Sequence, residues 1–325
     1  MKIINIPVKI KSGSKYKSQY GYFAIKDGIK NTRKINKFLM KKPLWLKTSK
    51  VDFKSKYFQI KSLVSSHNLS TVCEESKCPN INECWSHGVA TVMLMGSTCS
   101  RACKFCAVDT GNPHGWLDKN EPENTARLAQ FMQLKYIVIT SVTRDDLLDG
   151  GSRHFAQTVK TLKTSIKDIK VEVLIPDFLG DLNAVNTVIK SGVDVLAHNI
   201  ETVKRLTNAV RDNRASYSQS IKILKHAKIM KPTMLTKTSL MLGLGEQHQE
   251  VLKAMDDLRS AGVDILTLGQ YIQPTKYHFP IASFITPKEF SIYKEIALNK
   301  GFLDVSSGPM VRSSYRADRL FRNVK

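Results

Sequence analysis

The chain has 325 residues, 42% of them hydrophobic, enough for one large domain or a barrel with appendages. No apolar run approaches the roughly 20 residues of a membrane-spanning helix, which argues against a membrane protein. The formal net charge is +22, but residues 1–56 hold 16 Lys and Arg against Asp27 and Asp52, a net of +14, so only +8 falls on the other 269 residues. This uneven distribution argues against nucleic acid as the partner.

The N-terminal 40 residues are rich in Lys, Ile, Asn and Ser and show no helical or strand period. We predict a basic, largely flexible extension there. No apolar stretch followed by a small-residue cleavage site marks a signal peptide, and Arg33 is the one arginine where a transit peptide would carry several. A cytoplasmic protein is predicted, with a mitochondrial or plastid matrix as the alternative.

All six cysteines lie between positions 73 and 106, in two groups of three. The first triplet, C-x4-C-x5-C, is Cys73, Cys78 and Cys84, and the second triplet, C-x3-C-x2-C, is Cys99, Cys103 and Cys106. An iron–sulfur cube usually takes four protein ligands, so three cysteines leave one iron open. Zinc sites completed by His87 or His114 are the rival interpretation, and disulfides would need an oxidising compartment.

Apolar runs alternate with amphipathic stretches along the rest of the chain. The predicted strands are Ala90–Met95, Lys135–Thr140, Val171–Pro176, Val193–Asn199, Thr236–Leu242 and Asp264–Ile272. The predicted helices between them include Arg153–Ile166, Leu182–Lys190, Ser218–Ile229 and Gln249–Ala261. Continuous apolar strands suit a parallel sheet that is covered on both faces. The alternation predicts an α/β fold, an incomplete (β/α)6 barrel, with a doubly wound open sheet as the alternative.

Polar clusters follow four of these strands, at Thr140–Asp146, His198–Thr202, Gly243–Glu246 and Gln270–Pro274. The cysteine loop likewise follows the first strand. Because the C-terminal ends of barrel strands converge on one mouth, we predict that these clusters share a site with the second triplet.

The second triplet, in Cys-Ser-Arg-Ala-Cys-Lys-Phe-Cys, resembles the signature of the radical S-adenosylmethionine (SAM) superfamily. From about Lys42 to Leu320 the chain resembles the lipoyl synthase family of that superfamily. The first triplet matches the family's auxiliary-cluster motif in both spacings. The other matching stretches are Pro43–Lys47, Ser141–Gly151, His198–Thr202 and Gly308–Ala317, the last containing Arg-Ser-Ser-Tyr.

This resemblance implies an organisation of the chain. After the extension at 1–40, residues 41–88 form an N-terminal segment with the auxiliary-cluster cysteines. Residues 89–300 form a partial TIM-type barrel of the radical SAM kind, and residues 301–325 a C-terminal segment with the Arg-Ser-Ser-Tyr motif.

The resemblance also implies an activity: insertion of two sulfur atoms, at C6 and C8 of an octanoyl chain attached to a lysine of a carrier protein. The implied cofactors are two [4Fe–4S] clusters and SAM. A cluster on the second triplet would cleave SAM to methionine and a 5′-deoxyadenosyl radical. A cluster on the first triplet would give up sulfur, and two SAM molecules would be consumed per lipoyl group.

The resemblance assigns further residues. Ser314 would be the fourth ligand of the auxiliary cluster, with Ser313 as the second choice and a plain helix-capping turn as the structural alternative. Asn199, Glu201 and Arg214 would hold SAM, Arg214 through its carboxylate. The Gly-Gly-Glu sequence usual for the superfamily is missing at 140–144.

The implied partners are octanoylated lipoyl carrier proteins, namely acyltransferase subunits of 2-oxoacid dehydrogenases and the glycine cleavage H protein. A low-potential electron donor and an iron–sulfur carrier are also implied as partners. Neither nucleic acid nor a membrane is expected as a partner. A basic surface would steer acidic carriers, with tail charges Arg312, Arg316, Arg319, Arg322 and Lys325 contributing. The alternatives are a biotin-synthase-like radical SAM enzyme and a zinc-containing nucleic-acid-binding protein.

Overall fold

The computed structural model describes residues 10–28, 41–47, 57–86, 91–314 and 317. Two sheets account for its strands. The larger has the order β12-β11-β10-β9-β8-β7-β4-β3, and all its neighbouring strands are parallel except the pair β3–β4. Its strands are β3 (Ser70–Thr71), β4 (Thr91–Leu94), β7 (Tyr136–Ser141), β8 (Lys170–Leu174), β9 (Val195–Ala197), β10 (Leu235–Leu242), β11 (Ile265–Gln270) and β12 (Asp304–Gly308).

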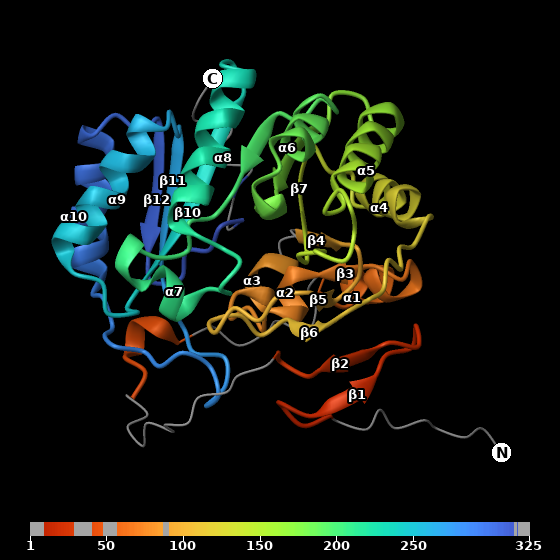
Figure 1. Cartoon of the computed structure of the whole chain (residues 1–325), viewed down its shortest axis with the longest axis horizontal. Helices are drawn as coiled ribbons and strands as arrows, with labels where there is room; N and C mark the ends of the chain where they lie inside the picture. The colour runs from red at the N-terminus through yellow and green to blue at the C-terminus, as the bar shows by residue number, and fades with distance from the viewer. Residues whose placement is uncertain (1–9, 29–40, 48–56, 87–90, 315–316, 318–325) are drawn as a thin grey trace.

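Helices follow the parallel strands and lie on the outside of the curved sheet (Figure 1). They are α4 (Glu121–Phe131), α5 (Ser152–Ser165), α6 (Leu182–Ile189), α8 (Tyr217–Met230), α9 (His248–Ser260) and α10 (Pro287–Asn299). Short helices occupy the connections, namely η2 (Phe178–Gly180), η3 (Lys204–Leu206) and α7 (Thr207–Val210). This arrangement confirms the predicted α/β fold with a parallel sheet, and in the described part of the chain no ladder closes it into a full barrel.

All six predicted strands are present, the first from Thr91, because Ala90 lies outside the described residues. The four predicted helices appear as α5, α6, α8 and α9. The strand β12 was not predicted. It lies at the end of the sheet, and Val305 is its one buried residue, so its sequence lacks the continuous apolar run of a central strand.

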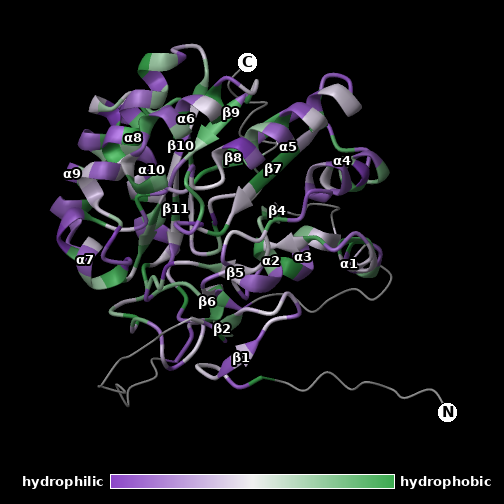
Figure 2. Ribbon diagram, turned by 45° about the vertical axis from the view of Figure 1, so that its right-hand side comes forward, coloured by the Kyte–Doolittle hydropathy of each residue, from purple (hydrophilic) through white to green (hydrophobic). Residues whose placement is uncertain are grey.

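Two apolar clusters fill the interior. One packs β4, β7 and β8 against α4–α6 and the N-terminal helix α1 (Tyr57–Ser66), and the other packs β10–β12 against α8–α10. Hydrophobic residues accordingly concentrate on the strands, and hydrophilic residues on the outer faces of the helices (Figure 2). Capping boxes begin α9 at Gln247 and α10 at Thr286, satisfying backbone N–H groups at both helix starts.

The N-terminal part corrects one expectation. Residues 15–25 form a hairpin of β1 (Lys15–Lys17) and β2 (Phe23–Ile25), where we had predicted no regular structure. The hairpin joins β6 (Asp109–Gly111) and β5 (Thr98–Cys99) in the smaller sheet, ordered β1-β2-β6-β5. Its short strands are stabilised by distant partners, which a local period cannot reveal. The rest of the predicted extension, residues 1–9 and 29–40, lies outside the described residues.

In Figure 1 the hairpin lies beyond one end of the large sheet, next to the short helices α2 (Val72–Glu75) and α3 (Ile81–Ser86) that carry the first triplet. A 3-10 turn, η1 (Leu44–Leu46), precedes them in the chain. None of the described helices combines the length and apolar character needed to cross a bilayer.

Candidate functional site

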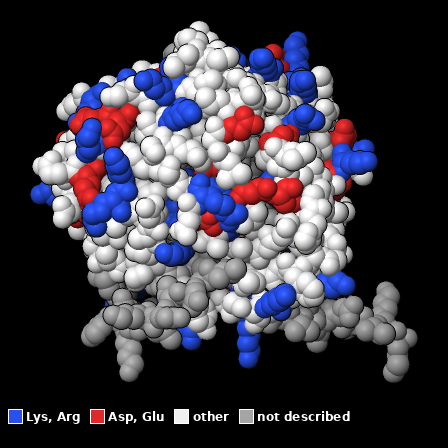
Figure 3. Space-filling model, viewed as in Figure 1, with Lys and Arg blue, Asp and Glu red and all other residues white. Residues whose placement is uncertain are grey.

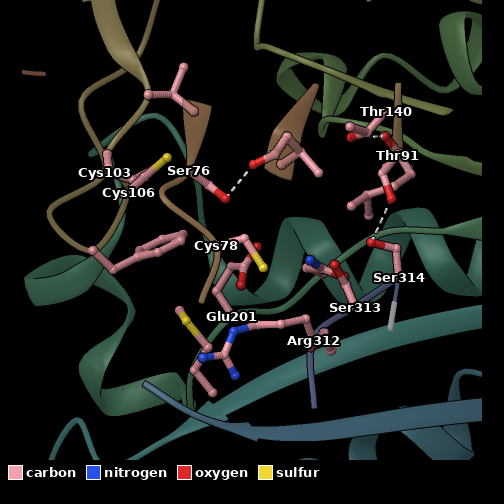
Figure 4. A pocket seen from close by; sticks show the side chains of 18 of the residues that line it. Ser76, Cys78, Thr91, Cys103, Cys106, Thr140, Glu201, Arg312, Ser313 and Ser314 are labelled. Carbon is pink, nitrogen blue, oxygen red and sulfur yellow. Dashed lines mark hydrogen bonds between the residues drawn. The ribbon is translucent and has the colours of Figure 1, made fainter. Parts of the chain in front are cut away.

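One cavity of about 500 Å³ opens at the C-terminal ends of the parallel strands, and all six cysteines line it. The six are thiols rather than disulfides. Apolar side chains of β4 and β10 and of the residue after β8 form much of the remaining wall, among them Met93, Met241 and Ile175. The two triplets, predicted from separate motifs, therefore share one chamber at the barrel mouth (Figure 4).

Backbone N–H groups point at the sulfur atoms of the second triplet. The N–H of Arg101 donates to Cys99 Sγ at 3.4 Å, and that of Asp212 donates to Cys103 Sγ at 3.3 Å. Burial raises the pKa of Cys103 to about 12 and that of Cys73, in the first triplet, to about 11. Both thiols therefore stay protonated at neutral pH when no cation is bound to them.

A buried arginine fixes the loop of the second triplet. Arg101 donates to both oxygens of Asp145, at 2.8 and 2.9 Å, and to Asp177 at 2.7 Å. These carboxylates follow β7 and β8. Burial alone would raise the pKa of Asp177, but the Arg101 guanidinium holds it below its usual value. Next to Arg101, the N–H of Ala102 donates to Asp212 at 2.9 Å. Charged groups from three parts of the barrel thus set the conformation of one loop.

Helices and apolar packing position the first triplet. Cys73 lies on α2, whose first turn is capped by the Thr71 side chain, and Cys84 lies on α3. The chain turns between them where the N–H of Cys78 donates to the carbonyl of Cys73 at 3.0 Å. Cys73 and the fully buried Trp85 belong to the apolar cluster around β4. Lys77 of this loop pairs with Asp27, which follows the N-terminal hairpin, at 2.6 Å.

The Arg-Ser-Ser-Tyr segment returns to this loop from the far end of the chain. Asn80 donates to the carbonyl of Met310 at 2.6 Å, and Thr91 donates to the hydroxyl of Ser314 at 3.0 Å. Ser313 and Ser314 both line the cavity (Figure 4). The segment packs closely on β11, where a Cβ on Gly269 would lie 2.1 Å from the Val311 carbonyl oxygen. Tyr315 lies outside the described residues.

Two of the three residues assigned to SAM lie at the cavity. Asn199 and Glu201 line it, and the Oδ1 atom of Asn199 is buried with no hydrogen-bond partner among the described residues. Burial raises the pKa of Glu201, which has a left-handed backbone (φ +65°) held by hydrogen bonds to Ser239 and Met241. A half-buried acidic side chain and an unsatisfied amide oxygen at a cavity suit a polar ligand with donor groups.

Arg214, the third assigned residue, is not brought to the cavity wall. Its half-exposed guanidinium donates to Asp212 at 2.8 Å, lies 3.0 Å from Asp145, and donates to the carbonyl of Ser100 at 2.9 Å. It therefore braces the second-triplet loop from outside.

Three of the four predicted polar clusters contribute to the cavity. The wall includes residues from 140–143, 198–201 and 270–274. The fourth cluster does not, because the Glu246 carboxylate folds back to accept from the N–H groups of Gly243 and Leu244 in its own loop.

Three arginines that line the cavity were missed or misplaced by the sequence analysis. Arg101 and Arg211 were not singled out, although Arg101 lies inside the second triplet. Arg211 is buried and donates to the Ser220 hydroxyl at 2.9 Å. Arg312 was predicted to be a surface charge, yet it lines the cavity. Burial lowers the pKa of Arg312, and nearby Cys78 opposes that effect. Of the other predicted tail charges, Arg316, Arg319, Arg322 and Lys325 lie outside the described residues, as does His87.

Among the described residues, no three His, Cys, Asp or Glu side chains gather closely enough to hold a single ion. A cube binds its cysteines through different irons, so its ligands lie further apart than those of one ion.

Comparisons with known proteins identify the family. The model of the Radical SAM superfamily matches residues 93–258. A protein of Francisella philomiragia subsp. philomiragia, named lipoyl synthase, is 58% identical over 320 residues, covering 98% of this chain and 97% of the relative. A protein of the same name from Legionella pneumophila (strain Corby) is 57% identical over 321 residues, covering 99% and 97%. The chain belongs to the lipoyl synthase family.

Membership in the lipoyl synthase family makes this chain a radical SAM enzyme and confirms the family predicted from the two triplets, in place of the biotin-synthase-like and zinc-protein alternatives. The alignments also reach further than the predicted match from residue 42, since 98% coverage must include most of residues 1–40.

Solved structures support the fold. Streptococcus suis SuiB bound to precursor peptide SuiA matches with a TM-score of 0.51 at 13% identity, covering 81% of this chain and 55% of that one. The FeFe-hydrogenase maturase HydG from Carboxydothermus hydrogenoformans matches with a TM-score of 0.51 at 11% identity, covering 71% and 64%. At such low identity these likenesses concern the fold alone.

Proposed function

We propose that this chain inserts two sulfur atoms, at C6 and C8 of an octanoyl chain carried on a lysine of a lipoyl carrier protein. The observation that carries this proposal is the single cavity lined by both triplets and by Ser314. Sulfur transfer to an alkyl chain requires the hydrogen-abstracting centre, the sulfur source and the chain within contact of one another. A volume of about 500 Å³ falls within the usual range of ligand pockets.

The second triplet would hold one [4Fe–4S] cluster, with SAM at its open iron, and the first triplet with Ser314 would hold the other. When bound, the cluster on the second triplet would supply reductive cleavage of SAM to a carbon radical, and the cluster on the first triplet would supply the sulfur. Asn199 and Glu201 would orient the polar atoms of SAM, while Met93, Ile175 and Met241 offer an apolar wall to the octanoyl chain. Arg214 would act on SAM through the loop it braces.

Ser314 suits a ligand that must be replaced. Its hydroxyl oxygen is a harder donor than a thiolate and so a weaker partner for a sulfide-rich iron. Thr91 donates a hydrogen bond to this oxygen, which favours its deprotonated, ligating form. We therefore assign the fourth ligand to Ser314 rather than Ser313.

The proposed partners are octanoylated acyltransferase subunits and the H protein, a low-potential electron donor and an iron–sulfur carrier, in the cytoplasm. The bacterial origin of the relatives supports that location. On the face in Figure 3, lysines and arginines stand among acidic residues instead of forming one uniform patch. Carrier docking would rely on local charge, so raising the salt concentration should slow turnover on the carrier protein more than on a short octanoyl peptide. Equal sensitivity would remove the electrostatic part of the proposal.

The decisive experiment counts iron and acid-labile sulfide after anaerobic reconstitution. Wild type should bind about eight irons, and the variant with Cys73, Cys78 and Cys84 changed to Ala about four, with SAM cleavage kept and no lipoyl product. About four irons in both proteins would mean that the first triplet holds no cluster, and the proposed sulfur source would be lost.

A further inference from the structure

Arg312 is a mostly buried cation on the cavity wall. In Figure 4 its side chain extends beneath Glu201 and Cys78, next to Ser313. Its Nη1 atom donates to two backbone carbonyls, those of Val311 at 2.6 Å and Pro309 at 3.5 Å. Neutral carbonyls orient the guanidinium without cancelling its charge.

Two of the other buried arginines of the barrel differ in this respect, whereas Arg211 also donates to neutral groups, the Ile200 carbonyl and the Ser220 hydroxyl. Arg101 contacts Asp145 and Asp177, and Arg144 contacts Asp146, all at 2.7 to 2.9 Å. No carboxylate of the described residues lies within 4.0 Å of Arg312, although Glu201 lies beside it in Figure 4. A largely buried charge without a close counter-charge is costly, so its presence points to an anion that the described residues do not supply within 4.0 Å.

The neighbouring first triplet indicates which anion this is. A [4Fe–4S] cluster held by three thiolates and a serine oxygen carries net negative charge, and Cys78 is the thiol beside Arg312. In the loop of the second triplet, by contrast, Arg101 is already matched by the carboxylates of Asp145 and Asp177.

We propose that Arg312 is a positioning residue for the auxiliary cluster: its charge offsets that of the cluster beside Cys78 and so holds the Ser314 segment against it. This inference rests on the proposed function. It predicts that loss of the charge leaves the iron-free protein as stable or more stable but weakens binding of the cluster. An arginine with a purely structural role would not produce this combination.

The test uses full-length chains in which Cys99, Cys103 and Cys106 are changed to Ala, so that only the auxiliary cluster can form. Arg312→Gln and Arg312→Lys are compared with Arg205→Gln, a matched loss of an exposed arginine whose partner is Glu250 on the surface. Iron per chain, the midpoint potential from EPR-monitored dithionite titration, and the unfolding midpoint of the iron-free protein are measured.

Arg312→Gln should unfold at the same or a higher denaturant concentration without iron, because an uncompensated charge is gone. It should nevertheless bind about two irons or fewer instead of about four, and the remaining cluster should have a more negative potential. Arg312→Lys should keep the wild-type potential, and Arg205→Gln should change neither quantity.

The inference would be overturned if Arg312→Gln had the iron content and midpoint potential of the parent protein. It would also be overturned if Arg312→Lys lost iron and shifted the potential as much as Arg312→Gln. A lower unfolding midpoint of iron-free Arg312→Gln would show an ordinary structural role and also overturn it. If the parent triple variant binds no iron at all, the proposed auxiliary cluster fails, and that outcome is separate from any effect of Arg312.

Discussion

The two cysteine loops face the same cavity but are stabilised in different ways. The second triplet spans eight residues and is fixed by charged groups, with Arg101 between two carboxylates and Asp212 bonded to the backbone of Ala102. The first triplet is held by short helices and apolar packing. Its proposed fourth ligand, Ser314, comes from a distant segment and is held at its side chain by Thr91.

This difference fits two cofactor roles. A centre that is used repeatedly benefits from a loop whose ligands do not move, and buried ion pairs with several hydrogen bonds provide that rigidity. A centre that is dismantled needs one ligand that can leave without unfolding the protein. One hydroxyl hydrogen bond contributes only about 1 kcal/mol, so Ser314 can be displaced at small cost.

The largest effect is expected from Arg101→Met. The change leaves Asp177 buried without its arginine partner and Asp145 with Arg214 alone, which should lower the free energy of unfolding by about 3–5 kcal/mol. Denaturant unfolding of the iron-free protein measures it, and SAM cleavage should be lost as well. Arg205→Met, which removes an exposed ion pair, is the control and should change little. Equal unfolding midpoints for the two variants would contradict the rigid-loop interpretation.

The barrel framework around the second triplet should also respond to pH. His198 lies between the Ile175 carbonyl and the Ser220 hydroxyl, and burial, assisted by Arg211, lowers its pKa to about 4. A histidine with a lowered pKa stabilises the fold fully above its ordinary pKa near 6.5. That stability is lost as the pH falls from about 6.5 towards 4.

Between pH 7.5 and 4.5, wild type should therefore lose up to about 3 kcal/mol more stability than His198→Gln, measured as unfolding free energy of the iron-free proteins. Parallel pH profiles for the two proteins would show that His198 is not buried in its neutral form.

A third change tests the Ser314 segment. In Gly269→Ala the new Cβ would meet the Val311 carbonyl oxygen at 2.1 Å, so the backbone must shift, at about 1–3 kcal/mol. Reconstituted iron should fall from about eight towards about four, with SAM cleavage retained. Gly308→Ala is the matched control, because its Cβ meets Val311 at an ordinary 3.5 Å. If both variants keep all their iron, the close packing on β11 does not position the segment.

The smallest effect should come from Thr91→Val, which removes the donor to Ser314 while keeping the side-chain shape. Stability should fall by about 1 kcal/mol, and a chelator should remove auxiliary iron faster than in wild type. Thr140→Val is the control, since its hydroxyl donates to the Leu174 carbonyl elsewhere on the wall. It should cost similar stability and leave iron loss unchanged. Equal rates of iron loss in all three proteins would show that the hydrogen bond from Thr91 to Ser314 does not help to retain the auxiliary cluster.

The sequence predicted those features that local pattern determines. Six parallel strands were found because each is a continuous apolar run, and the cysteines because their spacing is distinctive. The strand β12 and the hairpin β1–β2 were missed because both depend on distant partners. Arg101 looked like any loop charge, since its carboxylates lie 44 and 76 residues away. Arg214 was expected to hold SAM, and its guanidinium pairs with Asp212, two residues along the chain, so its contact with SAM stays a prediction.

The hydrogen bond between Thr91 and Ser314 joins residues 223 positions apart. During synthesis, which runs from the N-terminus, both cysteine triplets leave the ribosome long before Ser314 exists. The cysteines of the second triplet are complete within one short stretch of nascent chain, whereas the proposed auxiliary site also needs Ser314, whose segment packs on β11. On the proposed function, the order of translation therefore completes the two sets of ligands at different times.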